Sequence, residues 1–234
     1  YTLSLHDALP ISQDYLSWSR QMTGLLQGQR AEWSTKWRQL CEGLDPLAPA
    51  DENRLAVIAE AWTDYLHQCK QEGLHFIQPG RFVLPGDLAG APALQFFPWP
   101  DVDSIGESKL AQADKTTNAG MLRERYNYYC EKVVKGFYKN HFLRFDRQIV
   151  LVDCLQPLNS GPQAFNDMRL ALTQLMQSFH YGQRTLFRRL FSPVIDKLLF
   201  AATKADHVTV DQHANMVSLL QQLEIGRASC RERV

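Results

Sequence analysis

The sequence predicts an α/β protein that combines part of a parallel sheet, with two strands present, and a large, mostly α-helical region. Two short apolar runs, at 149–152 and 198–202, are each followed by a polar turn and a helix pattern. Consecutive strand–helix units of this kind form parallel sheets with right-handed crossovers. Because two strands do not make a stable parallel sheet alone, we expect further strands outside this sequence.

Both ends of the chain are expected to be artefacts of DNA sequencing. Residues 1–12 read YTLSLHDALPIS, the translation of a short-read sequencing adapter, and residues 224–234 read EIGRASCRERV, the translation of its reverse complement. Segments of such origin are excluded from fold reasoning. We therefore interpret 13–223 as an internal fragment of a longer protein, open at both ends.

The composition argues against several functional classes. With 25 basic and 25 acidic residues, the chain has no net field to attract nucleic acid or an anionic membrane, so we expect no nucleic-acid partner. No apolar run approaches the roughly 20 residues that a transmembrane helix needs, which predicts a soluble protein and leaves peripheral membrane contact open. Widely spaced cysteines predict buried, reduced thiols at Cys41, Cys69, Cys130 and Cys154.

Residues 13–146 are predicted to be mostly helical. Apolar side chains recur at three- and four-residue steps, and Asp51 stands where it would cap a helix. Dense prolines and glycines predict an extended segment at 76–100, whose aromatic side chains pack on the helices. From Ser108 onward one long helix is expected. The predicted buried stripes are Tyr15, Trp18, Met22, Leu25, Leu26, Trp33, Trp37, Leu40 and Cys41; Leu55, Ile58, Ala59, Trp62, Leu66 and Cys69; and Leu122, Tyr126, Tyr129, Val133 and Phe137.

A basic face on this last helix has two interpretations. Lys132, Lys135 and Lys139, with Arg144 and Arg147 nearby, fit a solvated helix face. Contact with phosphates or lipid headgroups is the alternative.

Residues 147–223 are predicted to form two strand–helix units. The first strand ends at Asp153, a turn follows at 155–161, and Ser160 with Gln163 suggests a capping box. The second strand, Leu198–Ala202, is expected to be buried on both faces, and Thr209 with Gln212 suggests a second capping box. The helices are expected to bury Phe165, Met168, Leu172, Leu175, Met176 and Phe179, then Val217, Leu220 and Leu223.

The turn after the second strand, Thr203-Lys204-Ala205-Asp206, is the candidate binding site. Open α/β sheets bind ligands at the carboxyl ends of their strands, and this tetrapeptide has the form of the base-recognition loop of GTPases. The Asp206 carboxylate can accept from two adjacent guanine N–H groups, which adenine lacks, while the Lys204 stem lies along the base. A plain strand-to-helix turn, with a surface lysine and a capping aspartate, is the alternative.

Long stretches of the chain resemble the middle of the YcjX family of bacterial P-loop GTPases. The resemblance covers essentially all of 13–223, and it implies a Ras-like nucleotide-binding core with a large helical insertion, associated with a phage-shock type of stress operon. It is carried by DPLAPADENR at 45–54, GLHFIQPGRFVLPG at 73–86, ALQFFPWPD at 93–101, EKVVKGFYK at 131–139 and IVLVDCLQPL at 149–158.

The resemblance implies that the insertion comprises residues 13–146 and that residues 147–223 are part of the core. It also implies that guanine is contacted by Thr203, Lys204 and Asp206. The family motif begins with asparagine, so Thr203 keeps a hydroxyl that can brace the loop but loses one amide donor. GTP or GDP with Mg²⁺ would bind the longer protein, which is expected in the cytoplasm or peripheral at the inner membrane. The G-x-x-x-x-G-K-[ST] phosphate loop is absent from this sequence, so we expect the fragment to be inactive and to bind no nucleotide tightly.

Two other functions stay open at this stage. The helical insertion is a candidate interaction module that docks a protein partner, for example a membrane-protein neighbour, under the control of nucleotide. The second alternative is an ATPase of the same fold, in which Thr203 weakens the selectivity of the loop for guanine so that ATP also binds.

Overall fold

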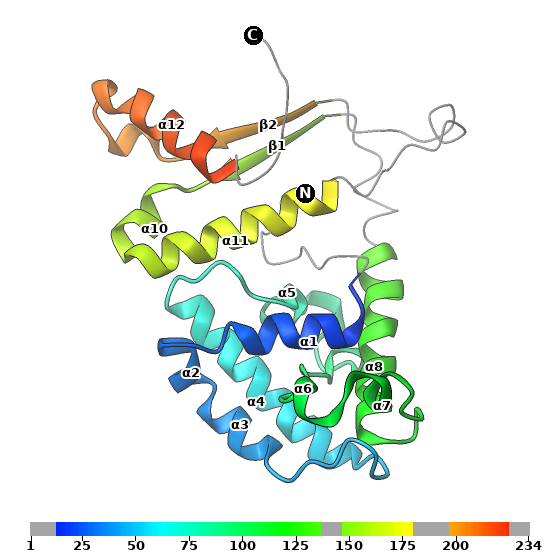
Figure 1. The fold of residues 1–234 in the computed structure, drawn as a ribbon. Coiled ribbons are helices and arrows are strands. Elements are labelled where there is room, and N and C mark those ends of the chain that lie inside the picture. Colours follow the sequence, from blue (N-terminus) through cyan, green and yellow to red (C-terminus); the bar gives the residue numbers. More distant parts are fainter. Residues whose placement is uncertain (1–12, 137–146, 180–196, 225–234) are drawn as a thin grey trace, which may run out of the picture. The chain divides into compact units, whose positions relative to one another are not determined.

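The structure, a computed structural model, describes residues 13–136, 147–179 and 197–224 (Figure 1). By their contacts these residues divide into two compact units. We call them the helical unit, comprising 13–72 and 77–136, and the sheet unit, comprising 73–76, 147–179 and 197–224.

The helical unit contains helices of very different lengths joined by short turns. In chain order they are α1 (Tyr15–Gly24), α2 (Gln29–Trp33), α3 (Thr35–Cys41), α4 (Glu52–Gln71), α5 (Gly80–Val83), η2 (Gly86–Leu88), η3 (Pro92–Leu94), α6 (Val102–Ile105), α7 (Glu107–Ala111), α8 (Asn118–Tyr128) and the π-helical turn η4 (Tyr129–Val134). The predicted cap of α4 is confirmed, since the Asp51 carboxylate accepts from the Arg54 N–H at 3.1 Å.

Aromatic side chains make up much of the core of the helical unit. The Trp18 ring stacks on Tyr126 with centroids 5.0 Å apart and meets Phe96 edge-on at 5.5 Å. The second cluster joins Trp37 and Trp62 at 4.9 Å. The stripe on α4 is confirmed as buried, as are Tyr15, Trp18, Met22, Trp37, Cys41, Leu122, Tyr126 and Tyr129; Leu25, Leu26, Trp33, Leu40 and Val133 are half-buried.

Two predictions for the helical unit were wrong in part. The segment 76–100 is not wholly extended, because α5, η2 and η3 interrupt it, although its aromatic side chains are buried as expected. The helix expected from Ser108 is broken at 112–117, where the Asp114 carboxylate accepts from the Thr116 N–H and hydroxyl and Thr117 caps α8. Such an Asx turn offers the backbone an alternative to the helix.

Of the basic face, Lys132 is exposed and Lys135 pairs with Glu131, while Lys139 and Arg144 lie outside the described residues.

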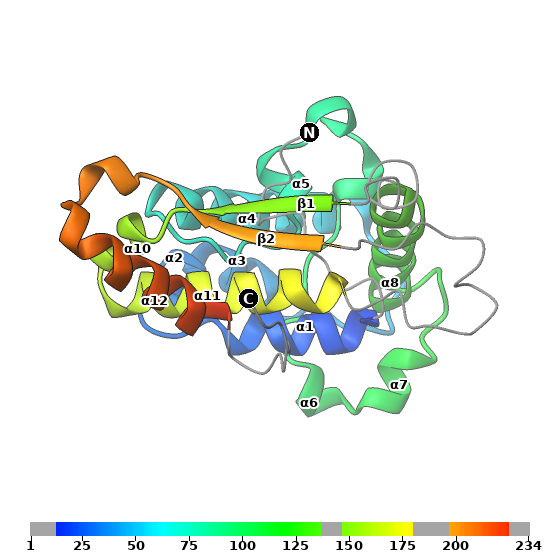
Figure 2. The same cartoon turned by 90° about the horizontal axis from the view of Figure 1, so that it is seen from above.

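The sheet unit contains two parallel strands and their helices. Its elements are β1 (Arg147–Val152), α10 (Leu155–Ser160), α11 (Pro162–Phe179), β2 (Lys197–Ala202), η7 (Ala205–His207), η8 (Val210–Gln212) and α12 (His213–Glu224). Figure 2 shows β1 and β2 side by side. The two strands pair in parallel, with Ile149 opposite Leu199 and Val152 opposite Ala202. Both strands and their parallel pairing confirm the prediction.

One face of the strand pair is covered and the other is open, which corrects the expectation of burial on both faces. Val152 is fully buried, whereas Ile149, Leu151 and Leu199 are 58–64% exposed within the part of the chain that the structure describes. Side chains alternate between the two faces of a strand, so these three form one apolar surface.

Neither predicted capping box forms in the sheet unit. Ser160 ends α10 and donates its hydroxyl to the Gln156 carbonyl, so 155–160 is a short helix and not a turn. Thr209 makes no side-chain cap to η8. Met168, Leu172, Leu175 and Leu220 are buried as predicted and Phe165 is half-buried, but Val217 is 52% exposed and Met216 takes the inward position.

The four cysteines at 41, 69, 130 and 154 are buried thiols outside any disulfide, which confirms that prediction. Among the described helices, none combines the length and the apolar character needed to span a membrane.

Candidate functional site

The candidate site lies at the carboxyl edge of the strand pair. Because β1 and β2 run parallel in register, their carboxyl ends fall at the same edge, so the residues that follow Val152 and Ala202 become neighbours. Asp153 follows the first strand and Thr203 follows the second. The described part of the site is therefore built from two loops and the helices after them.

The loop after β2 is held by hydrogen bonds at both of its ends. The Thr203 N–H donates to the Val152 carbonyl at 2.9 Å, and the Thr203 hydroxyl lies 3.4 Å from the same oxygen. Further along, the His207 N–H donates to the Lys204 carbonyl at 3.0 Å, and His213 Nε2 lies 2.9 Å from the Ala205 carbonyl. The hydroxyl of Thr203 is thus placed to brace the loop against β1.

Lys204 adopts a left-handed backbone conformation, with φ 60° and ψ 31°. Among the described residues it is the only non-glycine residue with positive φ. Residues with a Cβ rarely take this conformation because the Cβ approaches a backbone carbonyl. The turn therefore directs the chain into η7 at an energetic cost that other contacts must offset.

Asp153 joins the two loops of the site. Its Oδ2 lies 2.6 Å from Lys204 Nζ, and its Oδ1 accepts from the Leu155 N–H at 3.1 Å and the Gln156 N–H at 3.2 Å. Partial burial raises the pKa of this carboxyl, but the hydrogen bonds from Lys204 and the two N–H groups outweigh it and hold the pKa below its usual range. Asp153 was predicted to stand at the end of the first strand, but not to be a site residue.

Asp206 presents its carboxylate to solvent. The side chain is 85% exposed, and among the described residues its Oδ2 lies 3.8 Å from Nε2 of the neighbouring His207. An ionised carboxylate is an acceptor with about four lone-pair sites. Asp206 is therefore open to a ligand that offers paired N–H donors.

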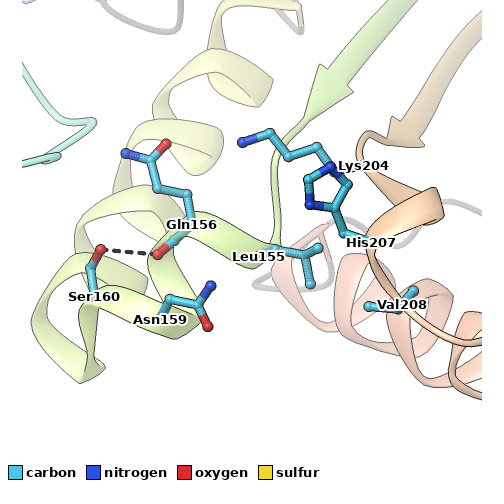
Figure 3. Close-up of a pocket in the computed structure, with 7 residues that line it drawn as sticks. All are labelled: Leu155, Gln156, Asn159, Ser160, Lys204, His207 and Val208. Carbon is cyan, nitrogen blue, oxygen red and sulfur yellow. Dashed lines mark hydrogen bonds between the residues drawn. The ribbon is translucent and has the colours of Figure 1, made fainter.

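A cavity of about 490 Å³ lies between α10 and the loop after β2 (Figure 3). Gln156, Asn159 and Ser160 face it from α10, while Lys204 and His207 face it from the loop. The structure brings Thr203, Lys204 and Asp206 together on one turn, but of these three only Lys204 lines the cavity.

A second polar cluster in the sheet unit was not predicted from the sequence. Asp167, buried on α11, accepts through Oδ2 from the His75 N–H at 2.5 Å and the Phe76 N–H at 2.6 Å. These contacts anchor the segment 73–76. Burial lowers the pKa of His75, and Asp167 and Asp153 oppose this shift without cancelling it.

The described residues offer an exposed carboxylate acceptor but no cluster of metal ligands. The exposed Asp206 carboxylate is a suitable acceptor for a base, whereas the described ranges contain no group of three or more histidine, cysteine or acidic side chains able to hold a metal.

Comparison with known proteins gives matches over nearly the whole chain. The family model described as "YcjX-like family, DUF463" matches residues 5–232. The chain is 90% identical over 219 residues to "Ras-like GTPase YcjX" of Escherichia coli (strain K12), covering 94% of this chain and 47% of that protein. It is 42% identical over 221 residues to the protein of the same name from Shewanella oneidensis, covering 94% of this chain and 46% of that protein. The chain thus spans about half the length of these curated relatives, and the boundaries at residues 13 and 223 stay predictions.

Proposed function

The chain belongs to the YcjX-like family, and from that premise we propose that it carries the guanine-recognition loop and the helical insertion of a GTP-hydrolysing protein with a Ras-like core. Residues 147–223 supply part of the core, and residues 13–146 are the insertion. The names of the relatives support the activity. Within this chain, the exposed Asp206 at the carboxyl edge of the parallel strands is the observation that carries the proposal.

Each residue of the loop has a proposed role toward the base. Asp206 accepts from the two adjacent guanine N–H groups, and a base without that pair leaves the carboxylate unsatisfied. The aliphatic stem of Lys204 lies along the ring. Thr203 holds the loop against β1 through its contacts with the Val152 carbonyl.

The chemistry on the phosphates belongs to other parts of the longer protein. A phosphate-binding loop and Mg²⁺ supply charge stabilisation for phosphoryl transfer, and neither a G-x-x-x-x-G-K-[ST] motif nor a described metal cluster is present here. We therefore propose that this chain alone neither hydrolyses GTP nor binds it tightly.

Nucleotide titration of the full-length protein tests the proposal. We expect fluorescent GTP and GDP analogues to bind it selectively over ATP, and the 13–223 segment, titrated beside it, to bind none of them tightly. The variant Asp206→Asn should weaken GTP binding by at least about tenfold and favour xanthosine triphosphate, because the xanthine carbonyl suits an amide donor. Unchanged GTP affinity in this variant would refute the role of Asp206, and a preference for ATP would favour the ATPase alternative.

A partner-docking role of the helical unit is a second candidate, which the separate aromatic core of that unit favours. In this proposal the longer protein acts in the stress response in the cytoplasm, and the insertion binds a protein, for example a membrane-protein neighbour. A pull-down with residues 13–146 tests it, with the same segment carrying charge reversals on its surface as the control. Retention of no partner by either segment counts against this role.

A further inference from the structure

We propose that Asp153 is a positioning residue for guanine selectivity, which acts by holding the ammonium group of Lys204 away from Asp206. The inference rests on the proposed function, because it concerns the same loop. It adds a residue from a different strand that no motif of the loop contains.

The two carboxylate oxygens of Asp153 contact different parts of the site. Oδ1 accepts from the Leu155 and Gln156 N–H groups at the start of α10, and Oδ2 meets Lys204 Nζ at 2.6 Å. The first set of contacts fixes the side chain on its own loop. The second joins that loop to the turn after β2, 51 residues further along the chain.

Lys204 needs such an anchor because its backbone is in the left-handed region at φ 60°. A lysine at this position is strained unless surrounding contacts stabilise it. The backbone hydrogen bond from His207 to the Lys204 carbonyl holds one end of the turn. The ion pair with Asp153, whose side chain is only 22% exposed, fixes the side chain.

The ion pair also decides which carboxylate Lys204 neutralises. Lys204 lies two residues before Asp206 in the chain, and its long side chain is 49% exposed. Without Asp153, the ammonium group becomes free to approach the exposed Asp206 carboxylate, and it would then compete with the N–H donors of guanine. With Asp153 in place, Asp206 keeps its acceptor sites for the base.

The variant Asp153→Asn separates this role from helix capping. Asparagine caps a helix about as well as aspartate, so the contacts to Leu155 and Gln156 are expected to persist. The charge that binds Lys204 is lost. Asp64→Asn is the matched control, since it removes the Asp64–Lys36 ion pair of 2.9 Å in the helical unit.

The experiment measures binding of GTP and inosine triphosphate to the full-length protein. Inosine lacks the 2-amino group, so the ratio of the two affinities reports how well Asp206 reads both donors. In Asp153→Asn we expect GTP affinity to fall about fivefold and the GTP-to-inosine ratio to fall with it. In Asp64→Asn both should stay at the wild-type value.

A double-variant cycle with Lys204→Met completes the test. Methionine keeps an apolar stem for the base and has no charge, so Asp153→Asn should have no further effect on nucleotide binding in this background. The same loss in both backgrounds would overturn the proposal, and so would an unchanged GTP-to-inosine ratio in Asp153→Asn alone. Failure of the guanine assignment itself is distinguished by Asp206→Asn, which would then leave GTP binding unchanged.

Discussion

The two units differ in how completely they enclose their apolar side chains. In the helical unit the tryptophans at 18, 37, 62 and 99 are at most 1% exposed. In the sheet unit the strands leave Ile149, Leu151 and Leu199 58–64% exposed on one face, within the described residues. An enclosed aromatic core supplies its own stability, whereas an open apolar sheet face lacks the burial that stabilises a parallel sheet. The helical unit thus encloses its large apolar side chains, whereas the sheet unit leaves one apolar face exposed among the described residues.

The largest effect is expected in the helical core. Replacing the fully buried Trp18 by alanine removes its stacking on Tyr126 and leaves a cavity. We expect the free energy of unfolding to fall by about 3–5 kcal/mol, measured by urea denaturation followed by tryptophan fluorescence and circular dichroism. Val57→Ala, at a position on α4 that is 52% exposed, is the control and should change it by under about 0.5 kcal/mol. Equal effects of the two variants would contradict an enclosed core.

The open face of the sheet predicts a difference between this chain and the full-length protein. In this chain Leu151→Ser should change the free energy of unfolding by under about 0.5 kcal/mol, because Leu151 is 63% exposed. In the full-length protein we expect a loss of more than about 2 kcal/mol, if further elements cover this face. Val152→Ala, on the buried face, should destabilise both proteins. If Leu151→Ser leaves the free energy of unfolding of the full-length protein unchanged, this face of the sheet is open there as well.

The segment 73–76 should depend on the buried carboxylate of Asp167. Asp167→Ala removes the acceptor of the His75 and Phe76 N–H groups. We expect the free energy of unfolding to fall by about 2 kcal/mol. Asp167→Asn keeps one oxygen acceptor, so its free energy of unfolding should fall by less. Amide hydrogen exchange at His75 and Phe76 checks the local effect, and unchanged protection in the alanine variant would show that Asp167 is not their anchor.

The smallest effect concerns pH. Burial lowers the pKa of His75 below its usual 6.5, so the unfolded chain binds a proton more readily than the folded one. The contribution of His75 to stability is therefore fully present above pH 6.5 and is lost as the pH drops below it. The lowered pKa of Asp153 has no influence in this window, since its contribution is lost only as the pH falls below 3.8. Melting temperatures between pH 7.5 and 5.5 should drop more for the wild type than for His75→Gln; parallel curves would argue against a role for His75.

Periodicity predicted the elements that make most of their contacts within one helix face or one strand. The stripe on α4, the cap at Asp51 and the parallel pairing of the two strands were all predicted correctly. The break before α8 was missed, because the Asx turn at Asp114 competes with an otherwise acceptable helix pattern.

Contacts between distant residues could not be predicted from spacing. The loop Thr203–Asp206 was found from its own four residues, and its role toward guanine stays a prediction. The contact between Asp153 and Lys204 depends on the register of the two strands, and the anchoring of His75 by Asp167 spans 92 residues. The open face of the sheet was missed because a continuous apolar run does not tell how much protein covers it.

Position 204 places two opposed demands on the choice of amino acid. Its left-handed backbone favours glycine or asparagine, while the neighbouring Asp153 favours a long cation. Glycine would relax the turn and lose the ion pair, and a β-branched residue would satisfy neither demand. Few of the twenty amino acids meet both demands, so most substitutions at position 204 are expected to give up either the relaxed turn or the ion pair.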